Sequence, residues 1–146
     1  MDFPDCTQET KNKKVAIRDK GAKNSKSIVY LFNPRQEVIQ LIDIEDCVIK
    51  EGLRCDKLAI APDKTLIFIE LKGNDNDVKK AIAQLTVSLN YIKNICTSAR
   101  KSKIIFLVSC TQYPRKNTQI QIQQAKLKKA GIMPVIKSGE LEYRVS

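Results

Sequence analysis

The sequence predicts an α/β fold in which a mixed central β-sheet is flanked by helices. Residues 66–69 and 104–108 are continuous apolar runs, the pattern of strands that are buried on both faces. Between them, apolar residues recur at spacings of three and four from residue 78 to residue 92, which predicts a helix with one face packed on the sheet. A helix between two buried strands is typical of a crossover that joins parallel neighbours.

The first of these strands also belongs to a predicted β-hairpin, in which residues 58–61 and 66–69 flank the turn residues 62–64, Pro-Asp-Lys. In an antiparallel pair, opposed residues have a constant index sum and point to the same face. A loop with an odd number of residues therefore puts Asp56 opposite Glu70, whereas an even loop turns Asp56 to the other face. With an odd loop, one face of the hairpin is apolar near the turn and charged at its open end.

The charged end of this face holds Asp56, Glu70 and Lys72. Two opposed carboxylates repel unless a cation lies between them, and carboxylate oxygens suit Mg²⁺ or Mn²⁺. Glu-x-Lys on an alternating strand is also common on a solvated sheet face, which is the simpler interpretation. The apolar residues before Glu70 favour a central strand instead, where charged side chains need compensating partners.

Five further segments have the composition of strands. They are residues 14–18, 28–32, 37–44, 132–136 and 142–145. Residues 47–49 would continue the third of these strands past a bulge or bend. Thr118 starts a capping-box pattern that predicts a helix ending near Gly131, although the Ile-Gln-Ile-Gln alternation leaves a strand open.

The chain length predicts a single domain of residues 1–146. Residues 1–27 form a basic N-terminal segment that is low in apolar residues, and we expect it to be partly disordered or to hold a short helix. The segment therefore does not predict the helix that usually covers the second face of such a sheet, and a homodimer would cover that face instead.

Composition excludes several classes of protein. The chain has no histidine, which excludes His-dependent triads and most zinc sites. No apolar run approaches the roughly 18 residues of a membrane span, so no membrane partner is expected. The five cysteines are odd in number, form no C-x-x-C pair and follow no signal peptide, so we expect reduced cysteines and a cytoplasmic protein.

The net charge of +10 is spread unevenly along the chain. Residues 93–146 carry eleven basic and two acidic residues, whereas residues 27–92 carry eight basic and ten acidic residues. A basic surface attracts a polyanion, and a local acidic cluster within it invites a metal ion. The charge pattern favours nucleic acid as the partner over a plain solvated basic surface.

Asp56, thirteen intervening residues and the tripeptide Glu-Leu-Lys at residues 70–72 resemble the motif of the PD-(D/E)XK nuclease superfamily. This superfamily includes type II restriction endonucleases, Holliday-junction resolvases and RecB-type exonuclease domains. Gly73 and the helical sequence Ala-Ile-Ala-Gln-Leu at residues 81–85 add to the similarity, which covers about residues 38–110. The resemblance implies a restriction-endonuclease-like core and a metal-dependent nuclease, with DNA preferred over RNA.

The resemblance also implies roles for individual residues. Asp56 and Glu70, with the Leu71 backbone carbonyl, would hold Mg²⁺ or Mn²⁺. Lys72 would orient the attacking water or stabilise charge that develops in the transition state. Gln84 lies where the superfamily often places a helix glutamine near the metal site.

Two departures from the superfamily pattern leave another function open. The RecB-type branch has a tyrosine four residues after the glutamine, whereas this chain has Ser88 there and Tyr91 seven residues on. A third acid often joins the metal site from an upstream element, and Glu51 is the candidate. The alternative is a catalytically inactive nucleic-acid-binding module that keeps the nuclease fold. In either case, five basic residues are candidates for phosphate contact: Arg54, Lys79, Lys80, Arg115 and Lys116.

Overall fold

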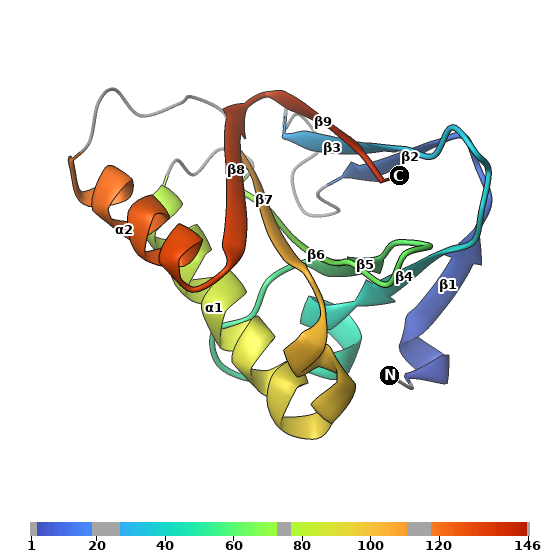
Figure 1. Ribbon diagram of the computed structural model, residues 1–146, viewed down its shortest axis with the longest axis horizontal. Helices are drawn as coiled ribbons and strands as arrows, with labels where there is room; N and C mark the ends of the chain where they lie inside the picture. The colour runs from blue at the N-terminus through green and yellow to red at the C-terminus, as the bar shows by residue number, and fades with distance from the viewer. Residues whose placement is uncertain (1–2, 19–26, 73–76, 111–117, 146) are drawn as a thin grey trace.

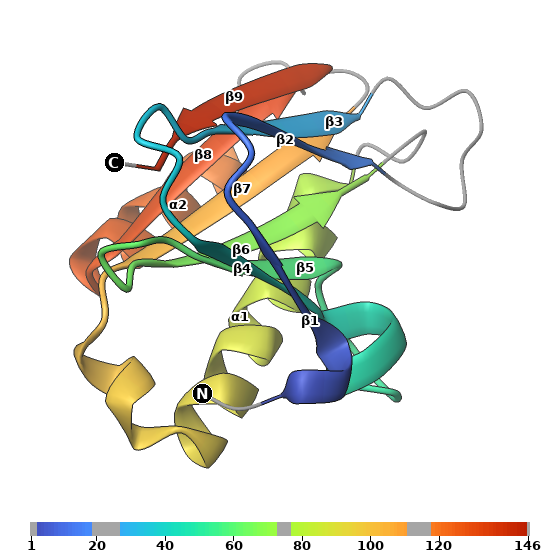
Figure 2. The same cartoon turned by 90° about the vertical axis from the view of Figure 1, so that its right-hand side faces the viewer.

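Two β-sheets pack face to face, and two helices cover the outer face of the larger sheet, which gives three layers (Figures 1 and 2). The computed structural model describes residues 3–18, 27–72, 77–110 and 118–145. The expected α/β class and the mixed sheet flanked by helices are therefore confirmed.

The larger sheet contains, within the described residues, six strands in the order β1-β4-β5-β6-β7-β8. The pairs from β1 to β6 are antiparallel, and β6, β7 and β8 are parallel neighbours. Helices α1 (Val78–Ile95) and α2 (Thr118–Lys129) lie between these parallel strands in sequence, as crossover connections require. The strands are β1 (Thr7–Thr10), β4 (Ile39–Asp43), β5 (Lys57–Ile60), β6 (Leu66–Leu71), β7 (Ile104–Cys110) and β8 (Ile132–Ser138).

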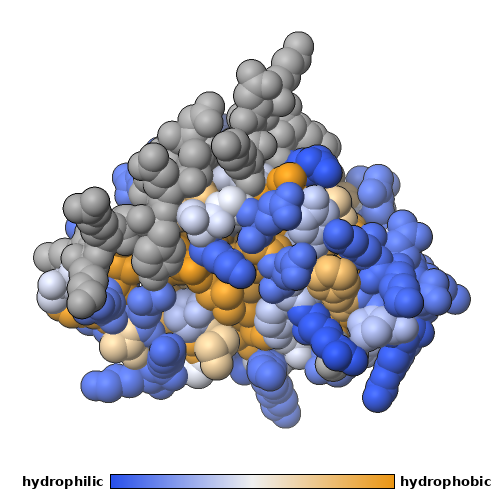
Figure 3. Space-filling view, turned by 90° about the horizontal axis from the view of Figure 1, so that it is seen from above, coloured by the Kyte–Doolittle hydropathy of each residue, from blue (hydrophilic) through white to orange (hydrophobic). Residues whose placement is uncertain are grey.

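The smaller sheet consists of β2 (Lys14–Arg18), β3 (Ile28–Phe32) and β9 (Glu140–Arg144) in the order β2-β3-β9. Strands β2 and β9 alternate between exposed and buried residues, so one face of this sheet is polar. On that face the Lys14 ammonium lies 4.2 Å from the ring centre of Tyr30. Hydrophilic residues cover most of the right-hand half of the surface in Figure 3.

The larger sheet separates two apolar cores, because its central strands are apolar on both faces. On one face, Leu58 and Phe68 of the hairpin pack with α1 residues such as Leu85. On the other face, Ile67 and its neighbours pack with β3 residues such as Leu31. Helix α1 is amphipathic, and no helix within the described ranges is long and apolar enough to cross a lipid bilayer.

The hairpin of β5 and β6 has the odd loop on which the sequence prediction depends. Leu58 pairs with Phe68 and Ile60 pairs with Leu66, so opposed residues share one index sum. Asp56 and Glu70 have the same sum and lie one step beyond the last pair, Lys57 and Ile69. The turn is closed by two backbone hydrogen bonds, from the Ala61 N–H to the Thr65 carbonyl and from the Lys64 N–H to the Ala61 carbonyl.

The second sheet covers the face for which the sequence suggested a homodimer. Residues 14–18, 28–32 and 142–145 were each predicted to be strands, but they belong to this separate sheet rather than to the central one. Strand β9 lies parallel to β3, with Ile28 opposite Glu140, so two segments that are far apart in the sequence pair there. Because this pairing is long-range, the local pattern of either strand does not reveal it.

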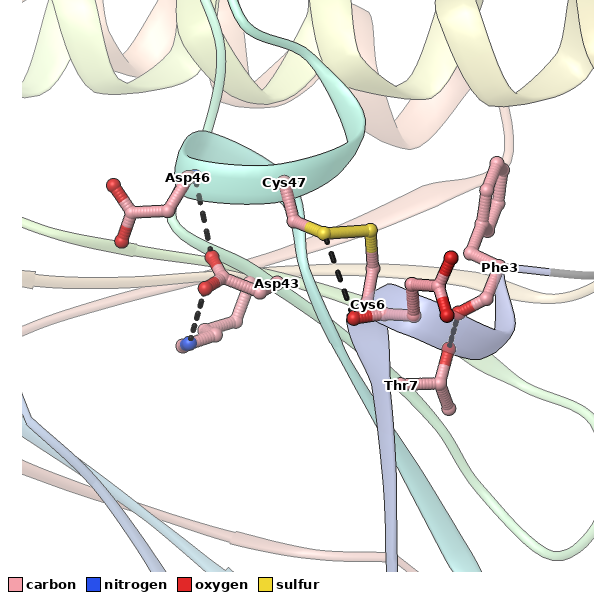
Figure 4. Close-up of a disulfide and its surroundings, with 8 residues drawn as sticks. Phe3, Cys6, Thr7, Asp43, Asp46 and Cys47 are labelled. Atoms are coloured by element: carbon pink, nitrogen blue, oxygen red, sulfur yellow. Dashed lines mark hydrogen bonds and ion pairs between the residues drawn. A yellow bond between two sulfur atoms is a disulfide. The ribbon is translucent and has the colours of Figure 1, made fainter.

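The N-terminal segment holds a short 3-10 helix, η1 (Pro4–Cys6), followed by the edge strand β1. Cys6 of this segment forms a disulfide with Cys47, 41 residues further on, with a Cα–Cα distance of 5.6 Å (Figure 4). The expectation that all five cysteines are reduced is therefore wrong for this pair, since spacing alone gives no sign of the contact. Cys55, Cys96 and Cys110 are free.

Replacing Leu31 by alanine tests whether the second sheet is integral to the fold. Leu31 is fully buried between the sheets, so its truncation should lower the free energy of unfolding by about 2–5 kcal/mol. Urea unfolding followed by circular dichroism measures this change. The exposed Ile122 of α2 provides a control, because Ile122→Ala should change stability by less than about 0.5 kcal/mol. A loss below about 1 kcal/mol for Leu31→Ala would mean that the smaller sheet opens without the larger one.

Candidate active site

The open end of the hairpin brings three charged side chains into the interior. Glu70 is 4% exposed and Lys72 is 9% exposed, while Asp56 is half-buried. They follow the apolar residues Leu58 and Phe68 on the face that packs against α1. The sequence prediction that Asp56 and Glu70 share a face is confirmed. Charges at this depth are stable only with partners, and each of the three has them.

The two carboxylates are held by the backbone of the opposite strand. The Leu71 N–H donates to Asp56 Oδ2 at 2.7 Å, and the Asp56 N–H donates to Glu70 Oε1 at 3.1 Å. The Asp56 N–H also lies 3.2 Å from the Ile69 carbonyl oxygen. Hydrogen bonds to charged acceptors are stronger than neutral ones. This reciprocal arrangement fixes both carboxylates against the end of β6.

Lys72 is positioned by a network that reaches α1. Its Nζ lies 3.4 Å from Glu70 Oε2 and donates a 2.5 Å hydrogen bond to Gln84 Oε1. Gln84 Nε2 donates in turn to the Arg54 carbonyl at 3.0 Å, which ties the helix to the start of the hairpin. The Lys72 backbone N–H donates to the Ser109 carbonyl of β7 at 2.9 Å. The structure thus brings Gln84 to the ammonium group, with both ends of its amide engaged.

Ser88, one helical turn after Gln84, has a packing role that the sequence did not predict. Its hydroxyl accepts a hydrogen bond from the Cys55 N–H at 2.8 Å and donates to the Gln84 carbonyl at 2.9 Å. It is fully buried. Tyr91, by contrast, is 40% exposed on α1. The residue at the position of the RecB-type tyrosine therefore anchors the backbone beside Asp56.

A further acid whose charge acts on both Asp56 and Glu70 is Glu45, whereas the sequence suggested Glu51. Residues 44–48 form a π-helical turn, η2 (Ile44–Val48), and do not continue β4 as predicted. The Asp43 side chain caps this turn by accepting from the Asp46 N–H. The nearby Glu45 side chain raises the pKa of Asp56, while Glu51 has no such effect on it; both glutamates are exposed. A capped turn at these residues was not visible in their β-branched pattern.

The backbone of η2 is tied to the same aspartate. The Ile44 and Glu45 N–H groups lie 3.1 Å and 3.4 Å from the Asp56 carbonyl oxygen. The Arg54 guanidinium donates to the Glu45 and Gly52 carbonyls at 3.1 Å and 2.7 Å. Arg54, predicted to bind phosphate, therefore uses its guanidinium to hold the loop that carries Glu45.

Burial makes full ionisation of this cluster unfavourable. Burial raises the pKa of Asp56, and its hydrogen bond with Glu45 and the charge of Glu70 raise it further. Burial also raises the pKa of Glu70, and the Lys72 ammonium offsets only part of that effect. A hydrogen bond between two carboxyl groups requires a proton on one of them. Without a further cation, the cluster keeps a proton that an isolated pair of surface acids would lose.

The two carboxylates are of the donor type that a hard divalent cation takes when it keeps much of its water shell. Within the described residues, no group of three or more acidic, cysteine or histidine side chains is arranged to hold a metal ion. Mg²⁺, however, is usually bound through one or two carboxylates, with water and substrate oxygens completing its shell. Asp56 and Glu70 supply two carboxylates on one face, and the Leu71 peptide lies against the Asp56 carboxylate. A cation would reduce the repulsion between these two carboxylates.

The predicted phosphate-binding residues are divided by the structure. Lys79 and Lys80 are exposed in the first turn of α1, close in the chain to Lys72. Arg115 and Lys116 lie outside the described residues, as does Gly73. Of the candidates within the described residues, Lys79 and Lys80 are thus the two that are exposed, and they lie on the helix that carries Gln84.

Comparison of the chain with protein-family models, with curated proteins and with solved structures finds no match. The assignment of function therefore depends on the geometry and chemistry of the site itself.

Replacing Asp56 by asparagine should stabilise the metal-free protein by about 0.5–1 kcal/mol at neutral pH. Asparagine can still accept the hydrogen bond from the Leu71 N–H, but the substitution removes a carboxyl group whose pKa is raised by burial. A raised carboxyl pKa means that ionisation opposes folding once the pH exceeds the unfolded value of about 4. The gain should therefore be present at pH 7 and disappear near pH 4, and urea unfolding at both pH values in EDTA measures it.

Asp63→Asn is the matched control for this substitution on the same hairpin. Asp63 accepts a hydrogen bond from the Thr65 N–H in the exposed turn, and this bond lowers its pKa. Its ionised form therefore favours folding, and Asp63→Asn should give no gain at pH 7. A loss of stability in Asp56→Asn would instead identify Asp56 as a structural residue.

Proposed function

We propose that this chain is a metal-dependent nuclease that hydrolyses phosphodiester bonds in nucleic acid, with DNA as the preferred substrate. The observation that carries the proposal is the buried constellation of Asp56, Glu70, Lys72 and Gln84 at the end of a central strand. A buried Glu-x-Lys whose lysine is held by a helix glutamine is costly to build and has no evident role in stabilising an apolar core.

The architecture supports a restriction-endonuclease-like core. Strands β4, β5 and β6 form an antiparallel meander, α1 follows, and β7 and β8 join in parallel. The site lies at the carboxyl ends of β6 and β7, where open α/β sheets generally bind ligands. A second sheet on the other face is the main difference from a core that is covered by helices on both sides.

Asp56, Glu70 and the Leu71 carbonyl would hold Mg²⁺ or Mn²⁺, with Glu45 as the third acid nearby. When bound, such a cation polarises a phosphate oxygen and lowers the pKa of an attacking water. Asp56 and Glu70 are already fixed by the backbone, so little reorganisation is needed for them to act as ligands.

Lys72 would serve the reaction by its position. Its ammonium is held between Glu70 and Gln84, so its direction is set before substrate arrives. A fixed cation beside the scissile phosphate stabilises the negative charge that develops on the phosphoryl oxygens. Lys79 and Lys80 would contact neighbouring phosphates, since they are exposed at the start of the same helix.

One observation favours the alternative of an inactive nucleic-acid-binding module. Asp56 Oδ2, Glu70 Oε1 and Glu70 Oε2 each have a protein partner within 3.4 Å, so the carboxylates are satisfied in part without a metal ion. The two functions differ in one measurable respect, which is metal-dependent cleavage.

The nuclease proposal predicts cleavage of DNA in the presence of Mg²⁺ or Mn²⁺ and none in EDTA. Supercoiled, linear and single-stranded DNA, and RNA, are the substrates to compare on gels. Lys72→Ala should lower the cleavage rate by at least about 10²-fold, because the cation positioned for the reaction is lost. Binding should stay largely intact, because the many other basic residues remain. Lys101→Ala, in the short helix η3 (Thr97–Lys101) before β7, is the control and should cleave normally. Full activity in Lys72→Ala would rule out the proposed role.

The basic surface predicts steeply salt-dependent binding. Each phosphate that the protein neutralises contributes about −0.9 to the slope of log affinity against log salt for duplex DNA. We expect a slope of several units from fluorescence anisotropy, measured with Lys72→Ala so that no substrate is cleaved. Lys79→Ala/Lys80→Ala should reduce the slope, whereas a flat response in the parent protein would remove nucleic acid as a partner.

A further inference from the structure

The disulfide between Cys6 and Cys47 links the N-terminal helix η1 to the turn η2 that carries Glu45 (Figure 4). Both cysteines are half-buried. Cys47 Sγ lies 3.8 Å from the Asp5 carbonyl oxygen, a contact without a hydrogen bond because a disulfide sulfur has no proton. The disulfide therefore holds η2 against the edge of the molecule that β1 forms.

An open groove of about 510 Å³ gives access to this disulfide. It lies between the two sheets, where β1 and β2 face each other, and both cysteines line it together with Thr7, Arg18 and Lys57. Pockets of about 300–1,000 Å³ accommodate small molecules. A small thiol of tripeptide size fits this space. Arg18 offers positive charge to one of its carboxylates, whereas Lys57 is paired with Asp43 at 3.5 Å, and Asp5 also lines the groove.

The same turn connects the disulfide to the acidic cluster. Cys47 and Glu45 are two residues apart on η2, and the Glu45 N–H lies 3.4 Å from the Asp56 carbonyl oxygen. Apart from the disulfide, the turn is held by hydrogen bonds: the Ile49 N–H donates to the Ile44 carbonyl and the Asp46 N–H to the Asp43 side chain, while the Asp56 carbonyl and the Arg54 guanidinium bind its first residues. Glu45 is exposed, so apolar packing does not hold it in place.

We propose that the Cys6–Cys47 disulfide is a reversible thiol-exchange site through which a small thiol controls the position of Glu45 at the carboxylate cluster. In the oxidised protein the disulfide holds η2 so that Glu45 contacts Asp56. In the reduced protein η2 loses its covalent tether and keeps only its hydrogen bonds, those to Asp56 and Arg54 included, so it separates from the cluster more often. The effect on cleavage depends on the proposed nuclease function, whereas the exchange and the movement of η2 do not.

The exchange follows ordinary disulfide chemistry. The thiolate of the small molecule attacks one sulfur, the Cys6–Cys47 bond breaks, and the other cysteine leaves as a thiolate that takes up a proton. A second small thiol, after losing its proton, attacks the mixed disulfide. The products are two protein thiols and one oxidised disulfide of the small molecule, so the two electrons that reduce the protein come from the two small thiols.

Thiol labelling of the folded protein tests whether the site is reachable. The protein is incubated with reduced glutathione or dithiothreitol without denaturant, alkylated and mapped by peptide mass spectrometry. Cys6 and Cys47 should become labelled within about one hour, with a glutathione adduct on one of them at early times. The free cysteines are internal controls, because Cys96 is partly exposed whereas Cys55 and Cys110 are buried. Reduction only after denaturant has exposed Cys55 and Cys110 would overturn the proposal.

Hydrogen–deuterium exchange tests the link to the cluster without reference to activity. On reduction, peptides covering residues 44–56 should exchange at least about 10-fold faster, while those from β7 stay unchanged, because only the turn loses a tether. Cys47→Ser should show the fast exchange under all conditions, and Cys96→Ser should behave as the parent protein does. If Cys47→Ser does not fold, reduction and reoxidation of the parent protein give the same comparison. Unchanged exchange in 44–56 would overturn the proposal.

Cleavage assays then separate this proposal from the nuclease proposal. A nuclease should cleave several-fold more slowly after reduction and recover on reoxidation. A protein that cleaves nothing in either state, but whose residues 44–56 respond to reduction, would refute the nuclease function and retain the thiol-exchange site. A nuclease whose rate is the same in both states would overturn the control of the cluster by the disulfide.

Discussion

Two hydrogen bonds across the open end of one hairpin hold the candidate active site in place. The Leu71 N–H binds the Asp56 carboxylate, and the Asp56 N–H binds the Glu70 carboxylate. Each acid thus accepts from a backbone donor of the other strand, and displacing the Asp56 carboxylate would deprive the Leu71 N–H of this acceptor. This geometry requires the odd loop, because a shift by one residue would turn Asp56 to the face that packs on the second sheet.

Helix α1 completes the site because its polar residues meet the hairpin where its apolar face ends. Gln84 bridges Lys72 and the Arg54 carbonyl, and Ser88 binds the Cys55 N–H. These contacts align the helix with the start of β5, so the ammonium of Lys72 is fixed by both layers. The acidic turn η2 closes the third side, held by Arg54 and by the disulfide. A few polar contacts therefore position the charged groups, and the apolar cores on both faces of the sheet keep those contacts aligned.

Much of this arrangement follows from local pattern. Strand alternation and the Pro-Asp-Lys turn allowed Asp56 and Glu70 to be placed on one face, and helical spacing located α1 and the residues that pack on the sheet. Gln84 was identified as a candidate because the sequence around it resembles a nuclease motif, and the structure shows which atoms it contacts. These features depend on residues within about 30 positions of each other, where periodicity and turn chemistry carry information.

Long-range contacts decided the rest. The sequence indicated strands at both ends of the chain but gave no sign that β3 and β9 pair to cover the second face of the sheet, a role that the sequence had left to a homodimer. It also pointed to Glu51 and missed Glu45, which lies on the π-helical turn η2. That turn is stabilised by an Asp43 cap, by Arg54 and by the disulfide, and none of these contacts produces a periodic pattern in the sequence. Periodicity reports which face of an element is buried; which distant element covers that face depends on packing of the whole chain.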